Sequence, residues 1–242
     1  MALLSPHGIK EEAAGPGAGH ISLNGDTAPA DFRSGYRLKR PVEVVLAFAG
    51  LVLTFPLCLL VAGLVWLEDR GQVFVRQVRV GKHGRQFSLV KFRTMRDPGA
   101  ADVPRQATAN DGRITRVGRF LRATALDEVP QLLNILRGEM SFVGPRALLP
   151  KEVEVDPRSR YHRIEDVPNY DVRISVRPGL TGLAQVYASR DISRPKKFRY
   201  DALYVRRMSL WLDLQLFTVS VFISLTGRWP RRGRPVRRRG RE

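Results

Sequence analysis

The sequence contains a single cysteine, few histidines and few acidic residues. Cys58 lies inside an apolar run, so no disulfide can form within the chain, which suits a reducing compartment. The four histidines are scattered and show no spacing typical of a zinc site. No aromatic stacking platform or recognition helix for nucleic acid is evident. A disulfide-stapled domain and a zinc protein are therefore excluded, and a nucleic-acid-binding protein is disfavoured.

The shortage of acids leaves a strongly basic chain. Of its 242 residues, 41 are Lys or Arg and 23 are Asp or Glu, which gives a net charge of +18. A charge of this size indicates polyanionic partners, namely nucleic acid, anionic lipid or phosphate-bearing substrates. Much of the arginine flanks apolar stretches, which favours a membrane surface. A nucleic-acid-binding protein with a membrane anchor would account for the charge but not for the paired acids described below.

The uncharged run Val44–Leu67 predicts a membrane helix. A helix of this length reaches roughly 36 Å, enough to cross a bilayer. Pro56 falls in its middle, where it frees a carbonyl near residue 52 and bends the helix. Basic residues stand at both ends of the run, whereas a spanning helix carries its excess on one side. A single span is the simplest interpretation, but the charge balance favours a re-entrant helix that turns at Pro56. The flanking residues are Arg33, Arg37, Lys39 and Arg40 on one side and Arg70, Arg76, Arg79, Lys82 and Arg85 on the other.

Short strands and helices with turn-rich connections follow this run. They predict an α-rich α+β fold, residues 33–226, in which a membrane-embedded re-entrant helix carries a compact cytoplasmic domain. The expected strands are Val73–Val75 and Gln86–Phe92, around a turn at Gly81–Gly84. The expected helices cover Gly118–Arg122 and a segment with Leu126, Val129, Leu133 and Leu136 on one face, which ends at Gly138.

Residues 1–32 and 227–242 predict tails outside this domain. The first tail is rich in Gly, Ala and Pro without a period, which indicates disorder. The second holds eight arginines and one acid, which favours contact with anionic lipid on the cytoplasmic side. The preceding segment Leu210–Leu225 is apolar but interrupted by Asp213 and Gln215. We therefore expect an amphipathic helix in the membrane interface there, not a second span.

Asp127 and Glu128 are adjacent acids upstream of an apolar helical face. Thr124 to Asp127 has the form of a capping box, so a purely structural role at a helix start is one interpretation. Pro130 opposes it, because a proline in a helix interior costs on the order of 3 kcal/mol. A strained helix beside two acids favours a functional site. The local pattern leaves both interpretations open.

Basic residues accompany these acids in the sequence. Each alone is typical of a solvated surface, but several stand in loops with Gly and Pro, where side chains can converge on a ligand. Guanidinium groups suit phosphate oxygens, and Mg²⁺ binds one or two carboxylates together with phosphate oxygens. The pattern predicts a diphosphate substrate and a divalent metal, with one acid on the metal and the other attacking phosphorus. The basic residues are Lys91, Arg93, Arg113, Arg116, Arg119, Arg122, Arg146 and Arg177.

Several long motifs occur in a fixed order over about Tyr36 to Thr226. They are Lys91–Met95 (KFRTM), Arg113–Arg122 (RITRVGRFLR), Leu126–Arg146 (LDEVPQLLNILRGEMSFVGPR) and Val176–Val186 (VRPGLTGLAQV). In these motifs the sequence closely resembles the bacterial sugar transferase family, the monotopic polyprenyl-phosphate phosphoglycosyl transferases. The membrane helix of that family is re-entrant, in agreement with the charge balance.

The resemblance implies transfer of a phosphosugar from a UDP-sugar to polyprenyl (undecaprenyl) phosphate with release of UMP. This would be the first membrane step of exopolysaccharide, O-antigen or glycoprotein glycan synthesis, on the cytoplasmic face of the bacterial inner membrane. It implies that Asp127 is the nucleophile that forms a covalent phosphosugar intermediate and that Glu128 holds Mg²⁺. The implied substrate-binding residues are Lys91, Arg93, Arg122, Arg146 and Arg177.

The sequence departs from the family pattern in four places, none of which touches the acidic pair. Phe55-Pro56 stands where Ser-Pro is common, Glu43 replaces an Asp, Ala147 replaces a Pro, and Leu183 replaces a Trp, with no Asn-Gly-Arg after Val186. A catalytically inactive membrane scaffold for polysaccharide assembly is the alternative function. The intact Asp127-Glu128 pair argues against it.

Overall fold

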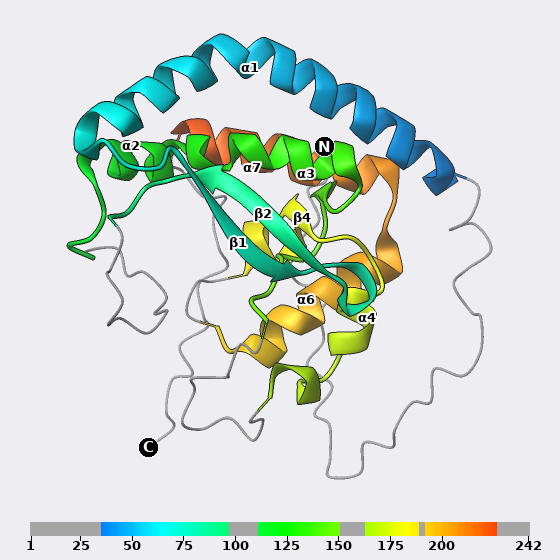
Figure 1. The fold of residues 1–242 in the computed structure, drawn as a ribbon. Coiled ribbons are helices and arrows are strands. Elements are labelled where there is room, and N and C mark those ends of the chain that lie inside the picture. The colour runs from blue at the N-terminus through cyan, green and yellow to red at the C-terminus, as the bar shows by residue number, and fades with distance from the viewer. Residues whose placement is uncertain (1–34, 97–110, 151–162, 189–191, 227–242) are drawn as a thin grey trace, which may run out of the picture.

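A computed structural model of the chain describes residues 35–96, 111–150, 163–188 and 192–226. Helices dominate in these residues, and the strands form two small two-stranded sheets, which confirms the predicted α-rich α+β class. The tails expected at 1–32 and 227–242 lie outside the described residues. Figure 1 shows one long helix arched over the rest of the chain.

The long helix α1 (Lys39–Asp69) is longer than the expected 44–67 and continues through Pro56 without a break. Among the described residues it is the helix with the length and composition to cross a membrane, and only 11% of its most apolar window is buried. Its concave side faces the domain (Figure 1). Pro56 removes one backbone hydrogen bond, and Thr54 Oγ1 donates to the Gly50 carbonyl at 2.6 Å, a contact that often bends helices. The turn expected at Pro56 is a bend within a continuous helix.

The first end of α1 is attached to the domain by polar side chains. Lys39 Nζ pairs with Asp213 Oδ2 at 2.8 Å. The Glu43 carboxylate, which is 5% exposed, accepts hydrogen bonds from the Ser141 hydroxyl and from the Phe142 N–H. Buried carboxylates are tolerated only when they are paired and hydrogen-bonded in this way, so these contacts specify where α1 begins.

The second end of α1 is attached to the same domain. Glu68 accepts the first two N–H groups of helix α2 (Arg116–Thr124), at 2.7 and 3.1 Å. An acidic group at a helix N-terminus is favoured by the unpaired N–H groups and the helix dipole. The next residue, Asp69, pairs with Arg93. Both ends of α1 therefore contact one body.

Two strands form a hairpin against this body. Strands β1 (Phe74–Val80) and β2 (Gln86–Phe92) pair antiparallel, with Val75 opposite Lys91 and Arg79 opposite Phe87. The predicted β2 and the turn before it are confirmed, whereas β1 extends to Val80, well beyond the expected Val73–Val75. Side chains at positions 75, 77 and 79 are partly buried, whereas those at 74, 76 and 78 are exposed. One face of β1 therefore lies toward the domain.

After α2 the chain continues as two helical segments instead of the one predicted. The 3₁₀ helix η5 (Leu126–Gln131) precedes α3 (Leu132–Arg137). Ala125, between α2 and η5, has a left-handed φ of 56°, and Pro130 has no N–H for a regular α-helical hydrogen bond. Gly138, with φ 83°, ends α3 as predicted. The predicted apolar face was partly wrong, because Leu133 is 38% exposed.

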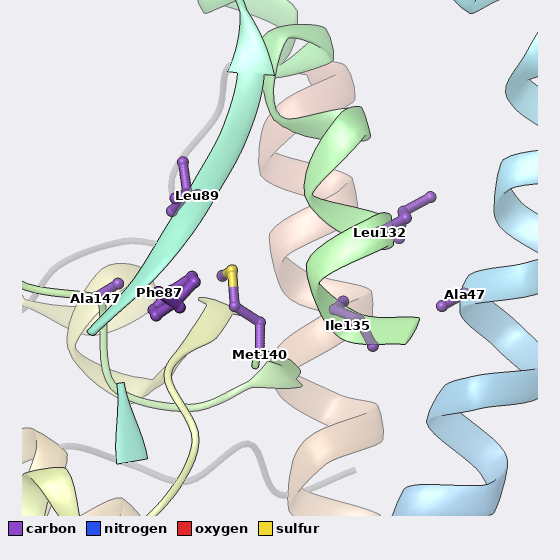
Figure 2. Close-up of a cluster of buried hydrophobic side chains, with 7 residues drawn as sticks. All are labelled: Ala47, Phe87, Leu89, Leu132, Ile135, Met140 and Ala147. Carbon is purple, nitrogen blue, oxygen red and sulfur yellow. The ribbon is translucent and has the colours of Figure 1, made fainter. Parts of the chain in front are cut away.

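One apolar core joins α1, α3 and the hairpin. Figure 2 shows Ala47 of α1 facing Leu132 and Ile135 of α3, with side chains of β2 beyond α3. The side chains of β2 are Phe87 and Leu89, and Met140 and Ala147, on either side of β3 in the sequence, complete the core. Helix α3 is therefore the layer between the long apolar helix and the hairpin.

The remaining elements complete the domain below α3. Strand β3 (Ser141–Val143) pairs parallel with β4 (Gly179–Thr181). A Cβ on Gly179 would lie 2.1 Å from the Gly144 nitrogen, so this close backbone approach requires glycine. The other elements are η3 (Gly35–Leu38), η4 (Lys82–Gly84), η6 (Ile164–Asp166), α4 (Tyr170–Ile174), α5 (Leu183–Tyr187), α6 (Arg194–Arg207) and α7 (Leu210–Thr226).

Helix α7 confirms the helix predicted at Leu210–Leu225 and shows why Asp213 interrupts it. Asp213 is buried, pairs with Lys39 and accepts the Tyr204 hydroxyl at 2.7 Å. A row of large apolar side chains along the helix is exposed, namely Leu210, Trp211, Leu214, Phe217, Val221 and Phe222. Apolar side chains are spread around the helix and are not confined to one face, so the predicted helix is present but the amphipathic character expected of it is not.

Asn134 ties α3 to β2 through its side-chain amide. The residue is fully buried. Its Oδ1 accepts the Val90 N–H at 3.1 Å, and its Nδ2 donates to the Ser88 carbonyl at 2.8 Å and to Glu139 Oε2 at 2.6 Å. The amide thus satisfies backbone groups of β2 that no neighbouring strand pairs.

Replacing Asn134 by Leu should destabilise the fold by about 2 to 4 kcal/mol, because the Val90 N–H and the Ser88 carbonyl would lose their partner inside the core. Thermal unfolding of the purified protein in detergent measures the effect. Leu133→Ala, at the exposed neighbouring position, is the control and should change stability by about 0.5 kcal/mol or less. An Asn134→Leu protein as stable as the wild type would contradict this role.

Candidate active site

The acidic pair lies on η5, against β2. Successive residues of a 3₁₀ helix point about 120° apart, so the two carboxylates face different surroundings. Asp127 is 8% exposed, whereas Glu128 is only partly buried. The two acids are thus suited to different tasks.

The capping-box interpretation of this segment is wrong. Thr124 is the last residue of α2, and its hydroxyl donates to the Phe120 and Leu121 carbonyls at 3.0 and 3.2 Å. No side chain caps the start of η5, where Ala125 occupies the capping position. Because Ala125 has a positive φ, the chain changes direction between α2 and the acids. Thr124 therefore does not form the predicted capping box.

Burial sets the charge state of Asp127. Loss of solvent, followed by the charge of Glu128, raises the pKa of the Asp127 carboxyl from its ordinary 3.8 to about 6, although Lys91 and Arg122 act in the opposite direction. The pKa of Lys91 is lowered by burial, which outweighs the opposing effect of Asp127. At neutral pH Asp127 is therefore a poorly solvated carboxylate with two cations in its field. Such a group is suited to attack an electrophile.

Arg122 reaches this site because α2 packs closely on the KFRTM segment. Its Nε donates to Thr94 Oγ1 at 3.0 Å, and one terminal nitrogen lies 3.2 Å from Met95 Sδ. A Cβ on Gly118 would lie 2.1 Å from the Thr94 carbonyl oxygen, so α2 can approach this closely only with glycine there. Two motifs far apart in the sequence thus orient one guanidinium group.

The structure brings together Asp127, Glu128, Lys91 and Arg122 among the predicted site residues. Arg93 instead pairs with Asp69 at the end of α1, and Arg177 Nε donates to the Gly138 carbonyl after α3 at 2.7 Å. The side chain of Arg146 is exposed, on the loop after β3. For these last three residues, substrate binding stays a prediction.

Arg79 was not predicted to belong to this site. Its charge contributes to the lowered pKa of Lys91, and its register opposite Phe87 places it on the domain-facing side of β1. The alternation of Val75, Gln77 and Arg79 could have indicated this face, had the strand been extended beyond Val75.

Comparison with known proteins now decides the family. The bacterial sugar transferase family matches residues 34–227. The chain belongs to the bacterial sugar transferase family. It is 39% identical over 189 residues to the UDP-glucose:undecaprenyl-phosphate glucose-1-phosphate transferase of Klebsiella pneumoniae, an alignment that covers 76% of this chain and 39% of that protein.

Two further relatives differ in length and in the sugar that their names give. A Caulobacter vibrioides protein with the same name as the Klebsiella one is 42% identical over 196 residues, which cover 78% of this chain and 70% of the relative. The UDP-N-acetylgalactosamine-undecaprenyl-phosphate N-acetylgalactosaminephosphotransferase of Aeromonas hydrophila is 37% identical over 193 residues, or 78% of this chain and 44% of the relative. The chain thus spans less than half the length of several sugar transferases that it matches.

The donor set of this bacterial sugar transferase fits Mg²⁺ bound together with a substrate. No group of three or more His, Cys, Asp or Glu side chains that could hold a metal occurs within the described residues. Mg²⁺ takes one or two carboxylates when substrate phosphates and water supply its other ligands, so one acid of the Asp127-Glu128 pair is enough to hold it. Glu128, the more exposed of the two, would hold the ion.

Replacing Asp127 by Asn should stabilise the metal-free protein at pH 7.5, by about 3 kcal/mol, because the buried carboxylate is no longer present. Below about pH 3.8 both the folded and the unfolded chain are protonated at Asp127, so the residue makes no difference. As the pH rises, Asp127 ionises first in the unfolded chain. Above about pH 6 it is also ionised in the folded state, and the free energy of unfolding is then lowered by the full cost of burying its charge.

Thermal unfolding of both proteins in EDTA, at pH 7.5 and at pH 4, measures this difference. The matched control is Asp111→Asn, because hydrogen bonds from Arg113 hold the pKa of Asp111 at about 2. That substitution should change stability in the opposite direction. Equal stability of Asp127→Asn and wild type at pH 7.5 would mean that the carboxylate is well solvated.

Proposed function

We propose that this chain transfers a sugar phosphate from a UDP-sugar to polyprenyl (undecaprenyl) phosphate and releases UMP. The observation that carries the proposal is the buried Asp127 carboxylate, with Lys91 and Arg122 beside it, in a chain of the bacterial sugar transferase family. The names of the relatives contain both proposed substrates. Glucose and N-acetylgalactosamine in those names make their UDP derivatives the first donors to test.

In the proposed mechanism an Asp127 oxygen attacks the sugar-bearing phosphorus. The bond from that phosphorus to the bridging oxygen breaks, and UMP leaves with the bridging oxygen. A phosphate oxygen of the polyprenyl phosphate then attacks the same phosphorus and breaks its bond to Asp127, which gives polyprenyl diphosphate sugar and restores the carboxylate. Splitting the transfer in this way is ordinary covalent catalysis with ping-pong kinetics.

The side chains around Asp127 support separate roles. Lys91 and Arg122 are placed to hold the negatively charged diphosphate, so that its phosphorus lies within reach of the carboxylate. Mg²⁺ held by Glu128 would neutralise charge on the phosphates and on the leaving UMP. The raised pKa of Asp127, about 6, still leaves the carboxylate ionised at neutral pH.

The proposed topology has both ends of α1 on one side of the membrane, the cytoplasmic side. A straight helix of 31 residues is about 46 Å long and would separate its ends across a bilayer. Here Lys39 and Glu68, near opposite ends, both bind the same domain. The middle of the arch exposes large apolar side chains, with Leu53 at 83%, which lipid would cover.

Helix α7 supports an interfacial position for the domain surface beneath the arch. Its exposed apolar row, defined above, suits the boundary between headgroups and acyl chains. We further propose that the arginines of 227–242, outside the described residues, contact anionic lipid, since each basic residue near such a surface contributes about 1 kcal/mol.

Trapping the intermediate tests the mechanism. Wild-type protein incubated with labelled UDP-glucose or UDP-N-acetylgalactosamine, without polyprenyl phosphate, should carry a phosphosugar on the peptide that contains Asp127, as read by mass spectrometry. Asp127→Asn should carry none, because an amide is a poor nucleophile, whereas Asp111→Asn should be labelled. Label on Glu128 would reverse the roles of the two acids. Full transfer by Asp127→Asn would refute covalent catalysis by this residue, whereas wild-type protein that neither carries the label nor transfers the sugar phosphate would support the scaffold alternative.

Cysteine labelling in intact cells tests the topology. In a Cys58→Ser background, a cysteine at exposed Leu38 and one at exposed Gln72 should both be protected from an impermeant reagent. Labelling at one end only would mean a true span. Pro56→Leu should favour that spanning state, because it restores the missing backbone hydrogen bond and straightens the helix.

A further inference from the structure

Arg146 stands on a loop whose backbone is held on both sides of it. Before it, the Gly144 N–H donates to the Thr181 carbonyl at 2.8 Å. After it, Leu148 pairs with Val80 of β1, whose N–H lies 2.9 Å from the Leu148 carbonyl oxygen. The side chain of Arg146 is exposed, whereas the two residues on either side of it are buried. The loop therefore presents one side chain, a guanidinium group, from a fixed backbone.

A buried arginine also holds the backbone of Arg146 itself. Arg173, on α4, is 6% exposed, and one of its terminal nitrogens donates to the Arg146 carbonyl. Its Nε donates to Asp201 Oδ2 on α6 at 2.7 Å. The same guanidinium group lies over the ring of Phe198, also on α6, 4.7 Å from the ring centroid. One side chain thus connects α4, α6 and the loop.

The pair of Arg173 and Asp201 is a costly way to join two helices. Asp201 is 3% exposed, and burial raises the pKa of its carboxyl above the ordinary 3.8, although Arg173 opposes this shift. Apolar residues of similar volume in place of a buried ion pair are often neutral or stabilising. Packing of α4 on α6 therefore does not require charges. An apolar pair, however, supplies no donor for the Arg146 carbonyl.

We propose that Arg173 is a positioning residue, which holds the backbone of Arg146 so that the Arg146 guanidinium group binds a phosphate group of one of the two substrates. The proposal rests on the proposed function and deepens it. The loop lies against β1, which pairs with the strand that carries Lys91, so Arg146 stands beside the hairpin that forms part of the candidate site. A backbone fixed before binding reduces the ordering that binding costs.

The phosphate belongs either to the UDP-sugar or to the polyprenyl phosphate, and steady-state kinetics distinguish these sources. In a ping-pong mechanism, kcat/KM for UDP-glucose or UDP-N-acetylgalactosamine reports the first half-reaction, and kcat/KM for polyprenyl phosphate reports the second. Both values are measured on the full chain in detergent, together with the melting temperature of each variant.

The test is a double-mutant cycle of Arg146→Met and Arg173→Lys. The lysine keeps a positive charge beside Asp201, but it lacks the planar fork that bonds Asp201 and the Arg146 carbonyl at once. The matched control is Arg206→Met, because Arg206 is an exposed arginine on α6. A purely structural role of Arg173 would lower activity by the same factor whether or not Arg146 is present.

We expect Arg146→Met to lower one of the two kcat/KM values about 10-fold or more, and Arg173→Lys to lower the same value about 3-fold or more. The protein with both substitutions should be no worse than Arg146→Met alone, and Arg206→Met should match the wild type. The substrate whose value falls is the one whose phosphate Arg146 binds.

Independent losses, in which Arg173→Lys has its full effect on top of Arg146→Met, would overturn the proposal. Unchanged kcat/KM values in either single variant would overturn it as well. If Arg173→Lys fails to fold, Arg173→Met combined with Asp201→Leu takes its place in the cycle, because a buried pair tolerates joint apolar replacement. Wild-type protein that releases no UMP would refute the proposed function, and this proposal with it.

Discussion

Lys39 near the start of α1 and Glu68 near its end both bind elements of the catalytic domain, and this double attachment constrains the rest of the structure. Because its ends are held, a long apolar helix can leave the domain only along its middle, where Pro56 and the Thr54 hydroxyl favour a bend. The Ser that commonly precedes this proline in the family is absent. Thr54 lies one residue earlier, and its hydroxyl donates a hydrogen bond to the Gly50 carbonyl in the same turn. The arch therefore does not depend on a hydroxyl at position 55.

The same attachments position the site. Glu68 caps α2, and α2 carries Arg122, so the end of α1 is connected to the candidate site through one short helix. On the side of α3, the Asn134 side chain joins α3 to β2, and β2 carries Lys91. Asp127 lies between these two supports, on the 3₁₀ turn that links α2 to α3. The geometry of the Asp127 carboxylate and its two neighbouring cations thus depends on the Glu68 carboxylate that caps α2 and on the buried Asn134 amide.

Sequence patterns predicted those elements that depend on residues near one another in the sequence. The hairpin turn, β2, the helix before Thr124 and the stop at Gly138 were predicted because glycines and residue spacing carry them. The capping box was wrong because the positive φ of Ala125 has no sequence signal, since alanine seldom adopts it. Asp213 was interpreted as a polar interruption because its partner, Lys39, lies at the other end of the domain. Arg93 and Arg177 illustrate the same limit, since a basic residue in a motif can bind a carboxylate or a carbonyl of its own chain as well as a substrate.

In the proposed topology, helix α2 has one side toward the lipid and the other toward the candidate site. Phe120 is 60% exposed, whereas Arg122, two residues later, is bonded to Thr94 beside the acidic pair. Residues two apart on an α-helix point about 200° apart, on nearly opposite sides. In the proposed topology Phe120 faces lipid and Arg122 faces the site, so the two are separated by roughly the 10 Å width of a helix. A polyprenyl phosphate has its chain in lipid and its phosphate at the surface. It could then present that phosphate to Asp127 without leaving the membrane, which gives a physical reason for building the dyad directly after this helix.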